Sequence, residues 1–464
     1  MNTINKTQRS VLLAANISYI LVILDSSIVN VALPSIRNEL SIGTDALQWI
    51  VNAYLVVFAS LLLSGGALCD RIGPKTIYIS GLLLFVAASL MCGLSVGATP
   101  LLVGRGLQGI GAALLVPSSL ALITHSYPDH SSRAKAIASW ASWGGIALVM
   151  GPLMGGLLTQ YLSWRSIFLI NIPIGLVGVW LTSRIETPAY PDHKKHFDLK
   201  GQFTVALMLL SLIWTLIEYP NASVDSEFIV LGGLICVASL MAFVLIESRT
   251  AHPMLPLMLF KNRNFSSIAY IFLAGAFSFF GTLFVLTFYF QDYLHYSAVE
   301  TGLALLPLSL CVIVGNKMSG RLVDRFQPRQ LMIAGALIRL VGFCAMLIPQ
   351  YSTAYSWLLV PLILIGLGGG LGAPMSTAVF MQSAPKIYTG IASGLSRATG
   401  QIGSALGVAV FGHYINDAAL FLAHMKLAVL MIVIATLSIV IVSILFVGDR
   451  QSEHGTLADP EKAK

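Results

Sequence analysis

Long apolar stretches separated by short polar segments recur along the whole chain. Each is about 20 residues long, enough for an α-helix to cross roughly 30 Å of hydrocarbon. Hydropathy together with the positions of Gly and Pro predicts fourteen membrane-spanning helices. They are expected near residues 11–33, 47–69, 76–96, 100–124, 136–159, 165–185, 201–219, 228–247, 266–290, 302–323, 330–349, 355–380, 388–413 and 426–447.

Composition agrees with this pattern. Of the 464 residues, 56% are hydrophobic and 10% are charged, whereas an ordinary soluble domain has about 25% charged residues. We therefore expect an all-α integral membrane protein without a sizeable soluble domain. The five cysteines stand singly in or beside apolar stretches, without the paired spacing of a metal or redox site. No metal and no cofactor other than protons is expected.

The basic residues punctuate the apolar stretches and do not cluster in one segment. The net charge of +7 therefore indicates topology and not nucleic-acid binding. If the first helix starts in the cytoplasm, most Lys and Arg fall in cytoplasmic loops, and Arg37, Arg165 and Lys426 fall outside. The positive-inside rule thus predicts that both termini are cytoplasmic. The first apolar stretch is too long for a signal peptide and is expected to be a retained span.

The longest polar loop between predicted helices divides the chain. It follows six helices, and six more follow residue 265. We predict an N-terminal six-helix half (1–185), an inner loop with two inserted helices (186–264), a C-terminal six-helix half (265–447) and a polar cytoplasmic tail (448–464). Two related six-helix halves around a central site are typical of secondary transporters.

A short motif occurs once in each half, at equivalent helix ends. The pattern G-x-L-x-D-R runs from Gly66 to Arg71 at the inner end of the second predicted helix and from Gly320 to Arg325 at the inner end of the tenth. A single such turn is more simply an anchor for a helix end at the lipid headgroups, but its duplication favours a conformational gate. The predicted gate residues are Gly66, Asp70, Arg71, Gly73, Lys75, Asp324 and Arg325.

These residues resemble the major facilitator superfamily, and the six-two-six plan resembles its fourteen-span drug:proton antiporter family. The resemblance covers about residues 10–450. It also rests on segments 24–34 and 164–175, and on the fourth-helix motif that contains Arg105 and Gln108. A fifth-helix motif that the family associates with antiporters matches Gly151, Pro152, Gly155 and Gly156.

The resemblance implies proton-coupled efflux of amphiphilic drugs or toxic compounds by alternating access. It further implies a location in the bacterial cytoplasmic (inner) membrane, with the lipid bilayer and a small amphiphilic substrate as partners and a functional monomer. A proton-coupled transporter of a specific metabolite or anionic amphiphile is the alternative, and a non-transporting scaffold or sensor is a third. We expect no enzyme, because no phosphate-binding loop or cluster of catalytic groups is found.

Asp25 is the one acidic residue that we place well within a predicted helix. It precedes Pro34 by nine residues, about 13 Å below the outer helix end, and Arg105 lies about 8 Å below its own. An extended Arg side chain spans that difference. We hypothesise that Asp25 carries the coupling proton and that Arg105 tunes it, since burial and a nearby cation act on a carboxyl in opposite directions. The alternative is a permanent ion pair that joins two helices.

The candidate substrate cavity is predicted from polar, aromatic and basic residues within spans. They are Asn30, Trp49, Tyr54, Gln108, Trp143, Phe284 and Arg397. Aromatic faces suit apolar and cationic ligands, although aromatic residues near helix ends more often anchor the membrane interface. Because only one carboxylate is placed well within a span, an anionic, zwitterionic or neutral amphiphile has as much weight as a lipophilic cation.

Overall fold

The computed structural model describes residues 6–185, 198–219, 226–250, 253–348, 355–385, 388–413 and 421–448, and these residues form helices and short turns without a β-strand. The N-terminal half comprises α1 (Lys6–Leu40), α2 (Thr44–Ile72), α3 (Pro74–Gly93), α4 (Ala98–Ser126), α5 (His130–Tyr161), α6 (Ser166–Leu169) and α7 (Asn171–Ser183). The inserted segment comprises α8 (Leu199–Glu218), α9 (Ser226–Arg249) and the 3₁₀ turn η1 (Leu257–Lys261). The C-terminal half comprises α10 (Arg263–Phe288), the π-helical turn η2 (Tyr289–Tyr293), α11 (Ala298–Leu322), α12 (Pro328–Met346), α13 (Ser356–Ser383), α14 (Thr389–Gly412) and α15 (Phe421–Leu445).

Every predicted span coincides with a helix, the sixth being the pair α6 and α7. In the described part of the chain, thirteen helical stretches are long and apolar enough to cross a membrane. The exception is α14, whose Gly, Ser and Thr residues and Arg397 lower its hydropathy. The prediction of an all-α membrane protein is therefore confirmed.

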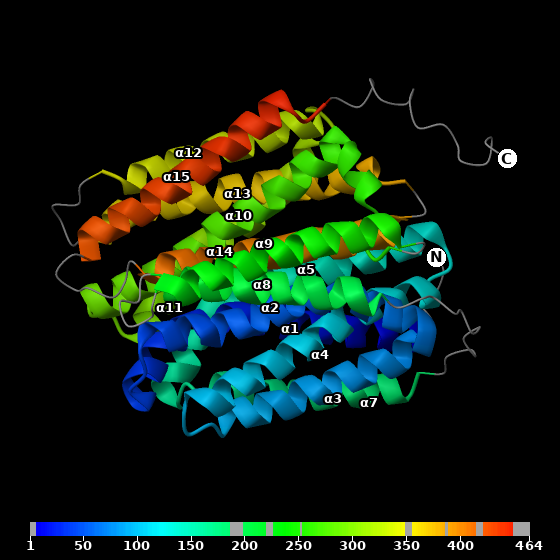
Figure 1. The fold of residues 1–464 in the computed structure, drawn as a ribbon, viewed down its shortest axis with the longest axis horizontal. Helices are drawn as coiled ribbons and strands as arrows, with labels where there is room; N and C mark the ends of the chain where they lie inside the picture. Colours follow the sequence, from blue (N-terminus) through cyan, green and yellow to red (C-terminus); the bar gives the residue numbers. More distant parts are fainter. Residues whose placement is uncertain are drawn as a thin grey trace.

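The helices lie side by side along the long axis of the molecule (Figure 1). Because the chain crosses the bundle an even number of times, α1 begins and α15 ends at the same side. We call this side, which also holds the ends of α2 and α11, the terminal face. The side that holds Leu40 and Thr44 is the opposite face.

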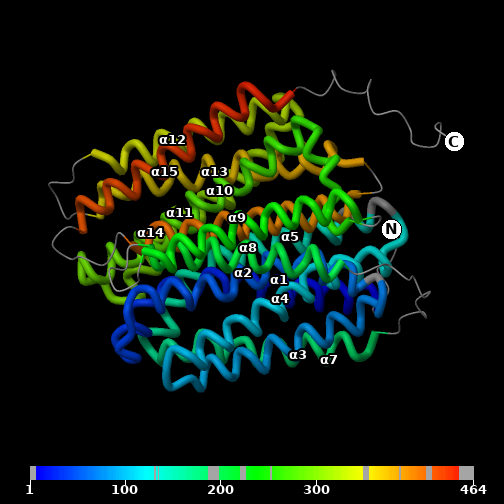
Figure 2. Tube along the Cα trace, viewed as in Figure 1, coloured from blue at the N-terminus to red at the C-terminus, as the bar shows by residue number. Residues whose placement is uncertain are grey.

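The two halves form two layers, with the blue and cyan helices on one side and the yellow to red helices on the other (Figure 2). They meet along two equivalent contacts, α2 with α14 and α5 with α11. The inserted helix α8 packs on both α2 and α14 and so covers one of these contacts, while α9 packs on α8. The inserted pair therefore bridges the two halves on one side of the bundle.

Glycines set the close helix crossings that position the central residues. A Cβ atom at Gly109 of α4 would lie 2.8 Å from the Tyr54 carbonyl oxygen of α2, so Gly is required for this approach. Gly73, between α2 and α3, has φ of 100°, a conformation that side chains disfavour. The crossing of α2 with α4 brings the polar residues of α4 next to α1 and α2.

Candidate functional site

Asp25 lies on α1 and is fully buried. The guanidinium of Arg105 donates a hydrogen bond to Asp25 Oδ2 and forms an ion pair with it. Asp25 Oδ1 accepts hydrogen bonds from Gln108 Nε2 at 3.1 Å and from Asn171 Nδ2 at 2.9 Å. The predicted partners Asp25 and Arg105 are thus in direct contact, and two neutral amides complete the surroundings of the carboxylate.

Arg105 has partners of its own besides Asp25. Its Nη1 donates to Gln108 Oε1 at 2.7 Å, and its Nε donates to the Ile50 carbonyl oxygen of α2 at 3.0 Å. The guanidinium carbon lies 4.4 Å from the centre of the Tyr54 ring, within cation–π range. The side chain is 1% exposed. Arg105 is therefore held in place by groups that do not depend on the charge of Asp25.

Asp25 forms a cluster with four residues, Arg105, Gln108, Ser89 and Asn171. This Asp25 cluster links α1, α3, α4 and α7 of the N-terminal half. Ser89 of α3 accepts a hydrogen bond from Gln108 Nε2 at 2.8 Å, and Asn171 of α7 contacts both Asp25 and Ser89. Sequence reasoning did not assign Ser89 or Asn171 to the site. For Asn171 a signal existed, since it is a polar residue in the apolar segment 164–175 that the resemblance already used.

The fifth-helix motif packs on α1 at residues that closely follow Asp25 in the chain. A Cβ atom at Gly151 would overlap the Ser27 side chain of α1, and one at Gly155 would lie 2.7 Å from the Ile28 carbonyl oxygen. Gly156 faces the Ala298 carbonyl oxygen of α11 in the other half. The motif therefore packs α5 against α1, two residues from Asp25, and against the C-terminal half at the same time.

The contact between α5 and α11 involves a glycine of α11 as well as the glycines of the motif. A Cβ atom at Gly302 of α11 would lie 2.6 Å from the Pro152 carbonyl oxygen. Pro152 stands inside α5, where its ring removes one backbone hydrogen bond. Small residues on both helices thus allow the two backbones to touch.

Arg397 lies at the contact between the halves. From α14 it donates a hydrogen bond to the Tyr19 hydroxyl of α1, and its guanidinium carbon lies 5.0 Å from the Tyr19 ring centre and 5.4 Å from that of Trp140. Tyr19 and Trp140 stack with ring centres 3.7 Å apart. Trp140 Nε1 is buried without a hydrogen-bond partner. We call Tyr19, Trp140 and Arg397 the interface cluster.

The other predicted cavity residues occupy different surroundings. Tyr54 is buried against Arg105, and its hydroxyl donates to the Val22 carbonyl oxygen at 3.0 Å. Asn30 is buried, with its Oδ1 unpartnered. Trp49 is partly buried, Phe284 is fully buried with its ring centre 5.2 Å from that of Phe288, and Trp143 is 43% exposed. The aromatic residue of α5 in the interface cluster is Trp140, which the sequence analysis did not select.

The predicted gate residues lie at the terminal face. Gly66 faces the Pro117 side chain, and Lys75 donates to the carbonyl oxygens of Ser183 and Ile185 at 3.1 and 2.5 Å. In the second copy of the motif, Asp324 and Arg325 are exposed, as Arg71 is in the first. The side chain of Asp70 lies outside the described residues.

Hydrogen bonds between the halves gather at the opposite face. Arg37 of α1 forms an ion pair with Asp292 of η2 at 2.9 Å. Gln291 Nε2 donates to the Val31 carbonyl oxygen at 2.8 Å, and Val299 N donates to Gln160 Oε1 at 3.0 Å. These contacts hold the two halves together at the opposite face.

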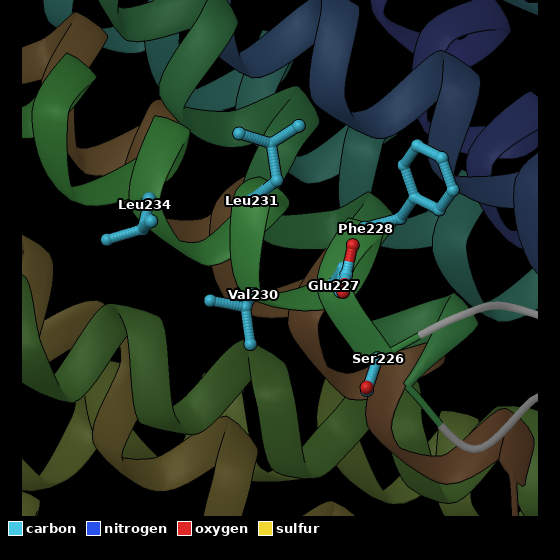
Figure 3. Close-up of a pocket in the computed structure, with 6 residues that line it drawn as sticks. All are labelled: Ser226, Glu227, Phe228, Val230, Leu231 and Leu234. Atoms are coloured by element: carbon cyan, nitrogen blue, oxygen red, sulfur yellow. The ribbon is translucent and has the colours of Figure 1, made fainter.

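A shallow recess on the surface of α9 has no connection with these clusters. Figure 3 shows the residues that line it, which are Ser226, Glu227, Phe228, Val230, Leu231 and Leu234. Apart from Ser226 and Glu227 in the first turn of α9, the lining is apolar. Within the described residues, no group of three or more His, Cys, Asp or Glu side chains is arranged to hold a metal ion. The candidate functional residues are therefore those of the Asp25 cluster and the interface cluster.

Comparison with known proteins identifies the family of this chain. The model of the Major Facilitator Superfamily matches residues 15–408. The methylenomycin A resistance protein of Bacillus subtilis (strain 168) is 36% identical over 428 residues, which cover 92% of either chain. The multidrug resistance protein Stp of Mycobacterium tuberculosis (strain CDC 1551 / Oshkosh) is 32% identical over 408 residues, 88% of this chain and 76% of its own.

A solved structure shares the fold at low sequence identity. The crystal structure of the peptide transporter POT in complex with sulfate has a TM-score of 0.68 and 16% identity, and the match covers 96% of both chains. Together with the helix plan, these matches describe a multi-pass membrane transporter and not an enzyme. The chain belongs to the Major Facilitator Superfamily and fits its fourteen-span drug-resistance members.

Proposed function

We propose that the protein exports amphiphilic, drug-like compounds across the bacterial cytoplasmic membrane in exchange for protons. Asp25 carries the proton and Arg105 controls its release. The names of the resistance proteins that this chain resembles support export. The observation that carries the proposal is the buried Asp25 carboxylate in contact with one guanidinium and two amides.

Protonation of Asp25 would cancel the charge that attracts Arg105. A buried cation without a counter-charge is costly, so such a pair resists protonation unless the cation has other acceptors. Arg105 has them in Gln108 Oε1, the Ile50 carbonyl oxygen and the Tyr54 ring. The guanidinium can therefore remain buried when Asp25 takes up a proton, which makes exchange at this site feasible.

The fifth-helix motif links α1, which carries Asp25, to α11 of the C-terminal half. Gly151 and Gly155 hold α5 against α1 at Ser27 and Ile28, and Gly156 holds the same helix against α11. A shift of α1 around Asp25 therefore moves the contact between the halves. Substrate and proton then favour different arrangements of the halves, which is the requirement for coupled exchange.

The proposal is tested in liposomes that contain the purified protein and an imposed pH gradient. A panel of cationic, neutral and anionic amphiphiles is added, and loss of the gradient is recorded. We expect particular compounds to dissipate the gradient with the wild type and with Glu227→Gln, a matched change at an exposed site on α9, but not with Asp25→Asn. An unchanged response of Asp25→Asn would place the coupling proton elsewhere.

The interface cluster favours a second candidate, transport of an anionic amphiphile. Arg397 already covers the faces of Tyr19 and Trp140, so a cationic substrate would meet a like charge there. A carboxylate could pair with the guanidinium while apolar groups contact the rings. In the same assay, Arg397→Gln would then abolish the response to anionic compounds and leave the response to neutral ones, whereas Arg397→Lys would retain part of the anionic response.

A further inference from the structure

Two carboxyl groups meet at the terminal-face end of the inserted α8–α9 pair, far along the chain from Asp25. Asp198 caps the start of α8, where its Oδ1 accepts a hydrogen bond from the Gly201 N–H at 2.9 Å. Glu247 lies in the last turn of α9 and is 3% exposed. Its Oε2 accepts a hydrogen bond from the Leu255 N–H at 3.2 Å, in the segment that leads to η1.

The second oxygen of each carboxyl is buried without a hydrogen-bond partner. Both of these oxygens, Asp198 Oδ2 and Glu247 Oε1, face the same place. A Cβ atom built on Gly201 would lie 2.6 Å from the first and 2.9 Å from the second. The absent side chain of Gly201 thus leaves the space into which both oxygens point.

No described cation compensates this pair. The charged side chains at this end of α8, α9 and η1 are Lys200, Arg249 and Lys261, and all three are exposed. The ion pairs of the described residues lie elsewhere, and neither Asp198 nor Glu247 takes part in one. Two ionised carboxylates this close, one of them buried, would repel each other with little solvent to screen them.

We propose that Asp198 and Glu247 bind one proton between them at neutral pH, which forms a proton site separate from Asp25. The proton removes one of the two charges and supplies the donor that the unpartnered oxygens lack. The proton is shared by the two carboxyl groups, so it belongs to neither residue alone. This inference does not rest on the proposed export function.

The position of the pair gives the proton a structural consequence. The α8–α9 pair is the covalent connection between the two halves, and the Glu247 bond to Leu255 fixes the start of the segment that leads to the C-terminal half. Gln202, next to Gly201, donates to the Ser60 carbonyl oxygen of α2 at 2.5 Å and is hydrogen-bonded to Ser64. Loss of the proton would therefore loosen the connection between α8, α9 and the N-terminal half.

The test uses the purified full-length protein in detergent and two readouts that need no substrate. The first is the infrared C=O stretch of a protonated carboxyl group at neutral pH. We expect this signal to diminish in Glu247→Gln and to persist in Glu227→Gln, which changes an exposed carboxyl at the other end of α9. It should also persist in Asp25→Asn, because Asp25 is paired with Arg105. An identical signal in wild type and Glu247→Gln would overturn the proposal.

The second readout is thermal stability as a function of pH. Since the folded wild type holds a proton that the unfolded chain releases, its stability falls as pH rises. Relative to Glu247→Gln, the folded-to-unfolded ratio of the wild type should drop about tenfold per unit between about pH 5 and the pH at which the pair loses its proton. Parallel pH profiles of the two proteins would contradict the proposal.

The test also includes a replacement variant and a comparison of salts. If Glu247→Gln does not fold, Asp198→Asn replaces it, because Asn can cap α8 and donate to Glu247 Oε1, which makes the proton unnecessary. The measurements are repeated with sodium, potassium and magnesium chloride at matched ionic strength. If one of these cations removes the pH dependence, the site binds a metal ion, and the proposal of a bound proton is refuted.

Discussion

The two halves of the bundle differ in the charged residues that are buried among their helices. In the N-terminal half, α1, α3, α4 and α7 surround Asp25 and Arg105. In the C-terminal half, Arg339 of α12 is 9% exposed and packs against Gly275 of α10 and Gly368 of α13. Arg339 donates to the Gly275 carbonyl oxygen at 2.7 Å and lies 5.5 Å from the Phe343 ring centre, but its Nε has no partner.

The comparison separates what the repeated architecture provides from what individual residues add. Both halves bury a guanidinium among glycine-rich helices, so the repeat alone does not create proton chemistry. Arg105 forms an ion pair with a carboxylate, whereas no ion pair of the described residues involves Arg339. Of these two buried guanidinium groups in the described residues, only Arg105 in the N-terminal half has a carboxylate partner, and the proposed exchange at Asp25 depends on it.

The largest effect is expected from changing the acid. Asp25→Asn should lower proton-coupled transport by about 10²–10⁴-fold, the range typical of a lost proton-transfer group. Asp25→Glu keeps a titratable carboxyl and should restore part of this loss. Initial rates in proteoliposomes measure both, and equal rates for Asn and Glu variants would indicate a role in packing.

Removal of each buried arginine sharpens the comparison. Arg105→Met leaves the Asp25 carboxylate buried without its cation and should destabilise the protein by about 3–5 kcal/mol at neutral pH. Arg339→Met leaves no carboxylate behind and should change stability by less than about 1 kcal/mol. Thermal unfolding in detergent distinguishes the two, and equal losses would contradict the account.

The contact between the halves is tested by adding a methyl group. Gly156→Ala places Cβ against the Ala298 carbonyl oxygen of α11 and should cost about 1–3 kcal/mol and slow transport. Gly145→Ala is the matched control on the same helix, since a Cβ atom there meets nothing within 4 Å. Transport rate and thermal stability are measured for both, and similar behaviour of the two variants would remove Gly156 from the contact.

The smallest effect is expected at the opposite face. Arg37 and Asp292 are both 29% exposed, and partly exposed ion pairs typically contribute about 0.2–1 kcal/mol. Arg37→Gln should therefore change the transport rate by no more than a few-fold. A double-mutant cycle with Asp292→Asn measures the coupling energy, and complete loss of transport in Arg37→Gln would mean that this pair governs the closure of the opposite face.

Much of the fold was predictable because spacing along a helix converts directly into depth in the bundle. Asp25 and Arg105 were placed near each other from their distances to Pro34 and Pro100, and they are in contact. Asn171 and Ser89 were not predicted, because a neutral polar residue in a span gives no charge signal. Trp140 and Trp143 stand three residues apart on α5, and sequence did not fix which faces α1. In the structure, the Tyr19 ring occupies the position that a Cβ atom of Gly144 would take, which identifies the face of α5 that packs on α1.

The gate motif shows a different limit. Its duplication located equivalent helix ends, but a repeat of sequence does not specify which contacts form in one conformation. Arg71, Asp324 and Arg325 are exposed, while Lys75 binds backbone carbonyl groups. Their part in a gate therefore stays a prediction, as does the cytoplasmic position of the terminal face.

The central claim is that Asp25 exchanges its proton when substrate binds. The most direct measurement is proton release into a weakly buffered solution as a transported compound is added to purified protein in detergent. We predict release of protons by the wild type and by Arg339→Met, and none by Asp25→Asn despite retained binding of the compound. Equal release by the wild type and Asp25→Asn would contradict the claim.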